Sequence, residues 1–528
     1  MYISERCKWY IGFAIIVIIV LLSLSLLHAP IWVSIGFITI LSVIAIYDVT
    51  QKKHSILRNF PIVGHMRYIL EFLRPEIQQF FIADNEGEKP FSRELRSTIY
   101  RRAKGINDTI AFGTGKDIDR VGYEWVTHSL MPKKLNEIET RVKFGGSDCK
   151  QPYMVSHLNI SAMSFGALSS NAVMALNKGA KLGGFYQCTG EGGLTKYHLQ
   201  GGDLVFQIGT GYFGCRTEDG KFSAEKFAEK ANLDSVKMIE IKLSQGAKPS
   251  YGRVLPAAKI TPEIAEIMGV GMDKDVLSPP AHSAFSTPLE FCHFIKQLRD
   301  LSNGKPIGFK LCIGSHVEFL AICKAMLETE IKPDFITVDG AAGGTGAAPL
   351  EFSNHIGMPL EDSLIFVHNA LVGCGLRNEI RIIASSKVAT GFDMVRLFAM
   401  GADICNSARA MMLAIGCIQS RQCNNNTCPV GVATQNPRLK KALVVEDKMY
   451  RVYNFHKATI QSCLEIIGAM GLTSADDVGP ENLKKRISVN EIKSYADLYD
   501  FIPENCLVDG NIPASFARAW QKAYANSF

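Results

Sequence analysis

Residues 385–435 read SSKVATGFDMVRLFAMGADICNSARAMMLAIGCIQSRQCNNNTCPVGVATQ, and this stretch decides the fold class of the chain. Its first half predicts a short strand ending at Ser386, a helix with Met394, Leu397 and Phe398 on one face, and a second strand, ADICNS. Small residues at two successive strand ends leave backbone N–H groups free for a phosphate, as in the last two βα loops of a (β/α)8 barrel. Such loops occur in most α/β proteins, so phosphate binding stays one of several possibilities here.

The second half of the stretch holds three closely spaced cysteines. Cys417, Cys423 and Cys428 follow the pattern C-x5-C-x4-C, and Pro429 comes directly after the last. Iron–sulfur clusters are held by closely spaced thiolates, often with a proline after one of them. Structural zinc usually takes C-x2-C pairs and a fourth ligand, and this stretch has neither. Three reduced thiols without a metal remain the alternative.

Five further motifs accompany the cysteine segment in a fixed order. They are ISAMSFGALS (160–169), TGEGG (189–193), EIKLSQGAKP (240–249), SPPAHSAFS (278–286) and DGAAGGTGAAP (339–349). Together they resemble glutamate synthase, in which three cysteines hold a 3Fe-4S cluster beside an FMN-containing barrel. From about residue 54 onward the chain resembles the small stand-alone FMN-binding glutamate-synthase-like proteins. The resemblance implies an α/β fold with a (β/α)8 TIM barrel, bound FMN and a 3Fe-4S cluster on the three cysteines.

Composition limits the class of protein and of partner. The chain has 528 residues, 47% of them hydrophobic, which is enough for a large barrel with extensions. A net charge of +6 without a long basic run does not favour a nucleic-acid partner. Fourteen cysteines without an evident paired framework suit a reducing compartment.

The N-terminus predicts a transmembrane hairpin. Two strongly apolar stretches, Trp9 to Leu27 and Pro30 to Tyr47, are each about long enough to cross a bilayer as a helix. Basic residues precede the pair (Arg6, Lys8) and follow it (Lys52, Lys53), which predicts that both ends lie on the cytoplasmic side. The expected location is therefore the cytoplasmic membrane, with the barrel in the cytoplasm. A buried helical hairpin is the alternative.

Four regions follow from these patterns. Residues 1–50 form the predicted hairpin, and residues 51–150 form an α-rich approach segment with a charged helix, FSRELRSTIYRRAKG. Alternating strands and helices begin at Gln151, so residues 151–440 are assigned to the barrel and its cysteine segment. Residues 441–528 are predicted to be a mostly helical extension.

One glycine motif matches the fingerprint of a nucleotide-binding domain but lacks its sequence context. Gly209, Gly211 and Gly214 spell GxGxxG after a plausible strand, but the polar sequence CRTEDGKFSA follows where a helix should open. The dinucleotide fingerprint therefore fails its context, and a nicotinamide-binding domain is not predicted.

The resemblance assigns residues to the flavin. Lys310, at the end of the strand IGFKL, matches a lysine on the anionic side of reduced FMN, although a lysine snorkelling from a strand end is the alternative. The loop against the flavin ring is matched by Met163, Ser164 and Gly166. The candidates for the phosphate end are Gly343, Gly344, Gly346, Ser386, Lys387, Ala408 and Arg409. The three glycines could instead form only a tight turn.

The substrate residues match the family less well. Lys248 matches a substrate-contacting lysine and Glu191 is the acid of TGEGG, so these two join Lys310 as catalytic candidates. The family's substrate glutamine falls on Val254, its carboxylate-binding arginine on Met268 and a further acid on Leu194. Because a dicarboxylate favours bidentate arginine, these departures leave the substrate open.

The resemblance implies reductive amination of 2-oxoglutarate to glutamate. No glutaminase domain or pyridine-nucleotide domain is predicted. We therefore expect ammonia to be free or supplied by a subunit, and electrons to come from a ferredoxin-like or membrane redox partner. Two alternatives remain. One is an FMN and iron–sulfur oxidoreductase on another substrate, such as an N-methylglutamate-synthase-like or 2-hydroxy-acid enzyme. The other is a non-catalytic membrane scaffold.

Overall fold

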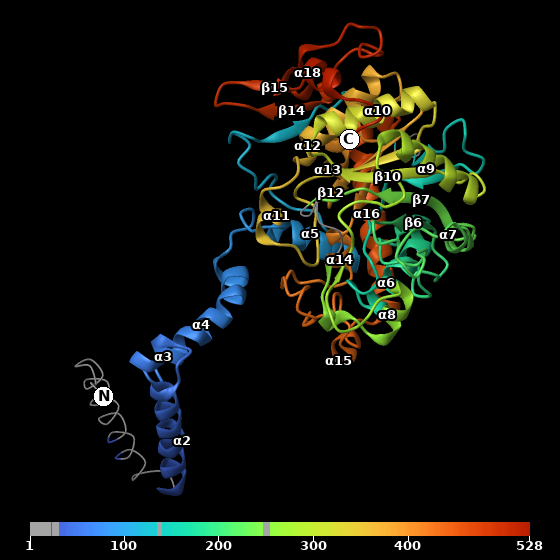
Figure 1. Cartoon of the computed structure of the whole chain (residues 1–528). Coiled ribbons are helices and arrows are strands. Elements are labelled where there is room, and N and C mark those ends of the chain that lie inside the picture. Colours follow the sequence, from blue (N-terminus) through green and yellow to red (C-terminus); the bar gives the residue numbers. More distant parts are fainter. Residues whose placement is uncertain (1–18, 20–22, 24–30, 135–139, 247–253) are drawn as a thin grey trace. The chain divides into compact units, whose positions relative to one another are not determined.

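The structure is a computed structural model that describes residues 19, 23, 31–134, 140–246 and 254–528 (Figure 1). It divides into two compact units, residues 1–94 and residues 95–528, which are described separately. The second unit contains the barrel and the motifs discussed above.

Eight parallel strands close into a barrel, as predicted (Figure 1). In barrel order the strands are β4 (Leu158–Ile160), β5 (Gln187–Cys188), β6 (Leu204–Ile208), β7 (Val236–Lys242), β10 (Ile307–Cys312), β11 (Phe335–Asp339), β12 (Arg381–Ser386) and β13 (Ile404–Ser407). The register places Lys242 beside Lys310 and Asp339 beside Ser385. Polar residues that end neighbouring strands therefore meet at one end of the barrel.

Most of the helices between the strands bury one apolar face. In α13 the residues Met394, Leu397 and Phe398 are buried, as the sequence predicts, and a Thr390–Asp393 capping box starts the helix. The main surrounding helices are α6 (Ser170–Gly183), α7 (Ala224–Ala231), α8 (Pro262–Met268), α9 (Pro288–Leu301), α10 (His316–Thr329), α11 (Leu350–Asn354), α12 (Leu360–Gly373), α13 (Gly391–Phe398), α14 (Arg409–Ala414) and α16 (Val445–Ala469). Turns follow β6, so GTGYFG does not open a helix.

A hairpin closes the N-terminal end of the barrel. It consists of β2 (Arg141–Phe144) and β3 (Tyr153–Ser156), paired antiparallel. Its buried residues join one apolar cluster with interior residues of the barrel, and the rings of Phe144 and Phe335 lie 5.7 Å apart. Because Phe335 begins β11, this plug leaves the opposite end of the barrel, where the strands finish, for the site.

The C-terminal region adds a small sheet to its helices. Strands β14 (Leu483–Arg486) and β15 (Ile492–Ser494) pair with β1 (Glu124–Val126) in an antiparallel sheet. The remaining described elements of this unit are α5 (Arg93–Lys104), β8 (Val254–Leu255), β9 (Val276–Leu277), α15 (Pro437–Lys440), α17 (Tyr495–Leu498), α18 (Ala514–Lys522) and the 3-10 segments η3 (Ala257–Lys259), η4 (Ala475–Asp477) and η5 (Pro480–Asn482). These strands break the predicted helical pattern of residues 441–528.

The N-terminal unit is helical where it is described. It contains α2 (Ile31–Thr50), α3 (Ser55–Asn59), α4 (Gly64–Ile77) and the π-helix η1 (Gln78–Ile82). Asp48 of α2 accepts hydrogen bonds from the Ile62 N–H and from the His65 ring, each at 2.9 Å, which ties α2 to the start of α4. The first predicted membrane stretch lies almost entirely outside the described residues. Within the part of the chain that the structure describes, no helix meets the length and hydropathy needed to cross a bilayer.

Candidate active site

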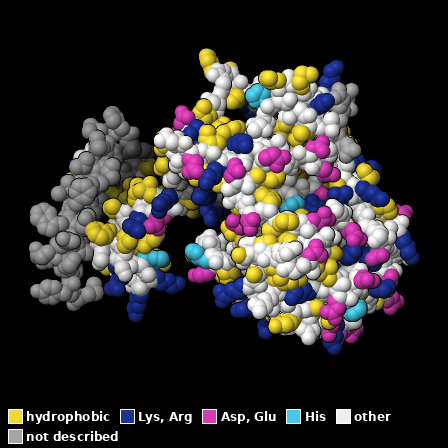
Figure 2. Space-filling model, turned by 90° about the horizontal axis from the view of Figure 1, so that it is seen from above, with side chains coloured by type: hydrophobic (Ala, Val, Ile, Leu, Met, Phe, Trp, Pro, Cys, Tyr) yellow, Lys and Arg dark blue, Asp and Glu magenta, His cyan; other side chains and the backbone are white. Residues whose placement is uncertain are grey.

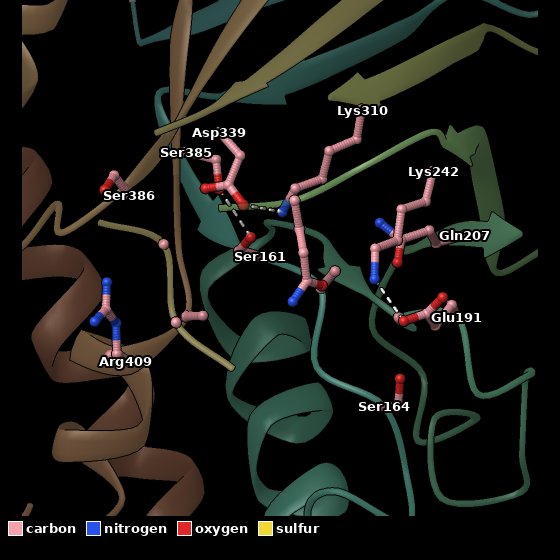
Figure 3. Close-up of a pocket in the computed structure, with 16 residues that line it drawn as sticks. Ser161, Ser164, Glu191, Gln207, Lys242, Lys310, Asp339, Ser385, Ser386 and Arg409 are labelled. Atoms are coloured by element: carbon pink, nitrogen blue, oxygen red, sulfur yellow. Dashed lines mark hydrogen bonds and ion pairs between the residues drawn. The ribbon is translucent and has the colours of Figure 1, made fainter. Parts of the chain in front are cut away.

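A polar cavity opens where the barrel strands end (Figure 3). It holds about 530 Å³ of space free of atoms, the open solvent at its mouth included. The cavity is lined by Ser161, Ala162, Ser164, Gly190, Glu191, Gln207, Lys242, Gln245, Lys310, Asp339, Gly343, Gly344, Ser385, Ser386, Ala408 and Arg409.

The first of two lysine–carboxylate pairs lies in the middle of the cavity wall. Lys310 of β10 and Asp339 of β11 approach to 3.3 Å, and both side chains are almost fully buried. Burial alone would lower the pKa of Lys310, but the charges of Asp339 and Glu240 outweigh it and hold that pKa above its ordinary value. Glu240 itself is buried and accepts hydrogen bonds from Gln207 (2.5 Å) and Thr337 (2.6 Å). The barrel therefore keeps a charged ammonium group at the wall of the cavity.

The second pair lies on one side of the first. Lys242, the last residue of β7, donates to Glu191 at 2.5 Å, and both side chains are largely buried. Figure 3 shows this pair and Gln207 on one side of Lys310, with Ser386 and Arg409 on the other. A side chain at Gly209 would collide with the Glu191 carboxylate, so the loop after β6 lies directly against this pair.

The other side of the cavity suits an anion. The Arg409 guanidinium donates to the Ala342 carbonyl at 2.6 Å and so packs on the glycine-rich loop after β11. A Cβ atom at Gly344 would lie 2.8 Å from Arg409 Nε, so only glycine leaves this arginine its position. Ser386, the last residue of β12, and Ala408, which follows β13, line the same side. Guanidinium, backbone N–H groups and a serine hydroxyl are groups that bind phosphate.

The three cysteines gather near this end of the barrel. Burial and the nearby charges of Cys423 and Cys428 raise the pKa of Cys417 to about 12. The Gln419 N–H lies 3.4 Å from Cys417 Sγ. Among the described residues no group of three or more His, Cys, Asp or Glu is arranged to hold a single metal ion.

The cysteine segment is fastened to the loop after β4, which lines the cavity. The Gln435 side-chain amide donates to the Gly166 and Leu168 carbonyls at 3.2 and 2.8 Å. Lys259, whose charge acts on Cys423, donates to the Ala167 carbonyl at 2.8 Å. One loop therefore links the cysteines to the cavity.

Comparison with known proteins agrees with this geometry. Residues 126–473 match the conserved region in glutamate synthase. The chain belongs to the glutamate synthase family. A glutamate synthase large subunit-like protein, YerD of Bacillus subtilis strain 168, is 38% identical over 485 residues, covering 84% of this chain and 92% of the relative. The archaeal glutamate synthase [NADPH] of Methanocaldococcus jannaschii is 32% identical over 381 residues, covering 71% of this chain and 70% of the relative.

One relative is much longer than this chain, and the matched region is a small part of it. The glutamate synthase [NADPH] large chain of Bacillus subtilis is 30% identical over 354 residues, which are 66% of this chain but 21% of that relative. The chain is thus a glutamate synthase-like oxidoreductase that shares one region with the large enzyme.

Membership of the glutamate synthase family supports FMN binding, and the cavity fits that cofactor. Arg409, Ser386 and the close approach of Gly344 form an end for the phosphate. Lys310 places a buried cation in the middle of the cavity, where a flavin ring that gains negative charge on reduction would be stabilised. The donor set therefore agrees with the cofactor that the family implies.

The cavity brings together many of the predicted residues. Those that line it are Ser164, Glu191, Lys310, Gly343, Gly344, Ser386, Ala408 and Arg409. Met163, Gly166, Gly346 and Lys387 are not among its lining residues in the described part of the chain. Lys248 lies outside the described residues, so its role stays a prediction.

Sequence reasoning missed six polar residues that line the site: Ser161, Gln207, Lys242, Gln245, Asp339 and Ser385. Lys242 and Asp339 are the last residues of β7 and β11, Ser161 follows β4, and Ser385 is the next-to-last residue of β12. The same signal that selected Lys310 would have found Lys242 and Asp339. Their partners come from other parts of the barrel: Lys310 lies on β10, and Glu191 lies in the loop after β5.

The three positions at which this chain differs from the family's substrate residues lie outside the lining of the first cavity. Leu194 and Met268 are both buried and line a second, separate cavity beside α7 and α8. Val254 lies in β8, which pairs with β9. The described lining of the first cavity therefore includes none of the three positions on which the family's substrate residues were expected.

Proposed function

We propose that the chain catalyses reductive amination of 2-oxoglutarate to glutamate in the polar cavity, with FMN as cofactor. The observation that carries this proposal is the cavity itself: an anion-binding side, a central buried lysine and a second lysine–carboxylate pair, in a member of the glutamate synthase family. Reduced FMN, when bound, would supply the hydride that the reaction needs.

The chain's own residues divide the remaining tasks. Arg409, Ser386 and Gly344 hold the phosphate, and Lys310 balances negative charge at the ring. Lys242 and Glu191 face the substrate: the ammonium binds a carboxylate, and the pair can exchange a proton with the reacting group. Gln207 and Glu240 orient Lys310 from inside the barrel.

We further propose that Cys417, Cys423 and Cys428 hold a 3Fe-4S cluster, which would supply electron transfer toward the flavin. Three thiols within mutual electrostatic range, one of them beside a backbone N–H, form a donor set suited to such a cluster. The links from Gln435 and Lys259 to residues 166–168 support a short route to the cavity. An external donor, ferredoxin-like or in the membrane, would supply the electrons, and ammonia would come free or from a subunit.

A related oxidoreductase on another substrate is the second candidate. Apolar side chains at Leu194, Val254 and Met268 favour it, because the arginine expected for a second carboxylate is replaced. An N-methylglutamate-synthase-like or 2-hydroxy-acid substrate would need fewer or different polar contacts.

One experiment separates the two candidates. Purified chain, reduced chemically, is incubated with 2-oxoglutarate and either ammonium or methylamine, and the products are identified by mass spectrometry. The proposal expects glutamate from ammonium. N-methylglutamate from methylamine alone, or reduction of 2-oxoglutarate to the 2-hydroxy acid without glutamate, would replace it with the second candidate.

We also propose that the N-terminal unit anchors the chain to the cytoplasmic membrane with the barrel in the cytoplasm. Support comes from the two apolar stretches and their flanking lysines, and from the exposed apolar side chains of α2, including Trp32, Phe37 and Ile40. Figure 2 shows exposed hydrophobic side chains on this unit, with Lys and Arg among them. Release of the full-length chain by alkaline carbonate would contradict the proposal.

A further inference from the structure

Two motifs without an assigned role meet beside the second lysine–carboxylate pair. His282, from SPPAHSAFS, has its Nδ1 2.9 Å from the Tyr212 hydroxyl and its Nε2 2.9 Å from the Lys242 carbonyl. Tyr212 comes from GTGYFG, the glycine motif that does not open a helix. Both side chains are buried.

The chemistry of the partners fixes the direction of every bond in this chain. The Lys242 carbonyl can only accept, so His282 Nε2 carries the proton and donates it. Neutral imidazole then has a bare Nδ1, which accepts from the Tyr212 hydroxyl. The Tyr212 oxygen in turn accepts from the Ala284 N–H at 3.2 Å. Burial lowers the pKa of His282 to about 4, so the ring is neutral at pH 7.

The loop that carries Tyr212 contacts both members of the pair. At Gly209 it approaches the Glu191 carboxylate too closely for any side chain. At Tyr212 it reaches Lys242 through His282. Tyr212 also has a φ of 48°, a left-handed conformation that costs a non-glycine residue about 1 kcal/mol or more. Strain of this kind persists where packing and hydrogen bonds over-determine the backbone, as they do around this buried ring.

We propose that Tyr212 and His282 are positioning residues that fix the Lys242–Glu191 pair at the substrate side of the cavity. The hydrogen bond to the last carbonyl of β7 sets the direction in which the Lys242 side chain leaves the strand, and the same loop sets Glu191. The inference deepens the proposed function and rests on it in one respect: a substrate carboxylate contacts Lys242.

Two substitutions at one position test this role. His282→Gln keeps an N–H for the Lys242 carbonyl and an oxygen for the Tyr212 hydroxyl, whereas His282→Leu removes both. We expect His282→Leu to raise the KM for 2-oxoglutarate about tenfold, since one buried carbonyl and one hydroxyl lose their partners, and His282→Gln to recover most of that loss. FMN content and the kcat at saturating substrate should change much less than KM in both.

A matched control separates positioning from stability. His456 is also buried, and its Nε2 lies 2.9 Å from the carbonyl of Leu158, the first residue of β4, at the opposite end of the barrel. His456→Leu should lower the melting temperature as much as His282→Leu does, with the KM unchanged. Equal KM increases in both leucine variants, or no recovery in His282→Gln, would overturn the proposal.

A spectroscopic measurement of the His282 ring tests the direction of these hydrogen bonds in the absence of substrate. The full-length chain, labelled with 15N-histidine and kept in detergent where needed, is compared with His282→Gln to assign the ring. We expect the Nε2–H tautomer at pH 7, with the Nδ1 signal shifting in Tyr212→Phe. A charged ring or an Nδ1–H tautomer would refute the chain. Failure of the unmodified protein to bind or convert 2-oxoglutarate, with the expected tautomer present, would instead refute the proposed substrate.

Discussion

The two ends of the barrel hold buried carboxylates in contrasting settings. At the N-terminal end Asp403 binds Arg377 and Arg381, each at 2.9 Å, and the Ile382 N–H at 2.5 Å. Asp334 there binds Arg299 at 3.0 Å and two backbone N–H groups. The oxygens of these carboxylates are used within the protein.

At the other end the carboxylates face the cavity. Asp339 binds Lys310 at 3.3 Å and the Gly246 N–H at 3.0 Å, and Glu191 binds Lys242. The partners at the cavity end are lysines, and each ammonium group has three N–H donors. The partners at the opposite end are arginines with planar guanidinium groups. At the end that stabilises the barrel, the carboxylates are bound by arginines and backbone N–H groups. At the end where a ligand enters, the carboxylates are paired with lysines whose ammonium groups can also contact the ligand.

The largest effect is expected at the anion-binding side of the cavity. Gly344→Asp would displace Arg409 and add a charge that repels phosphate, so the purified protein should lose its flavin. Gly271→Asp is the charge-matched control, because a Cβ at Gly271 meets nothing within 4 Å and this glycine does not line the cavity. Absorbance near 450 nm reports both. Full yellow colour in folded Gly344→Asp would contradict the assignment.

Replacement of one cysteine should remove the cluster and leave the flavin. Cys423→Ser deletes one of the three proposed ligands, while the residues of the phosphate end stay in place. Iron, labile sulfide and flavin are measured on anaerobically purified protein. Cys149→Ser is the control at the opposite barrel end, where a half-buried thiol lies 3.3 Å from the Gly304 carbonyl. Flavin without iron or sulfide in the unmodified protein would leave the three cysteines as structural thiols.

A large part of the barrel could be predicted because its strands are short apolar runs that end in polar residues. The strand IGFKL identified Lys310, and Ser386 at the end of β12 and Arg409 after β13 indicated the anion side. The pairings could not be predicted, since Glu191 and Lys242 lie 51 residues apart in the sequence. Their meeting depends on barrel closure and on the loop at Gly209, which no local pattern reports.

Replacing one aspartate at each end of the barrel tests the comparison of the two ends directly. Asp403→Asn leaves two arginines with weaker partners, so the free energy of unfolding should fall by about 3 kcal/mol while the folded protein keeps its flavin and turnover. Asp339→Asn should reduce turnover at least tenfold in protein that is still folded, because Lys310 loses the charge that holds it at the cavity wall. Urea denaturation and steady-state rates measure the two quantities. Similar rates in both variants would remove the functional contrast between the barrel ends.

The smallest effect concerns the pH dependence of stability. Burial lowers the pKa of His456 to about 3, with the charge of Arg141 adding to it, whereas an unfolded histidine titrates near about 6.5. Between these values the unfolded chain binds the extra proton, so the stabilisation is complete above about pH 6.5 and is lost as the pH falls toward the folded pKa. One such histidine contributes a slope of up to about 1.4 kcal/mol per pH unit to the free energy of unfolding.

The His456→Leu variant should therefore lose stability less steeply than the unmodified chain between pH 6.5 and 5.0, as measured by urea denaturation. Since His456 lies at the end of the barrel away from the cavity, saturating 2-oxoglutarate should raise the stability of both proteins and leave the difference between their slopes unchanged. Identical slopes in the two proteins would show that His456 is not held neutral by the fold.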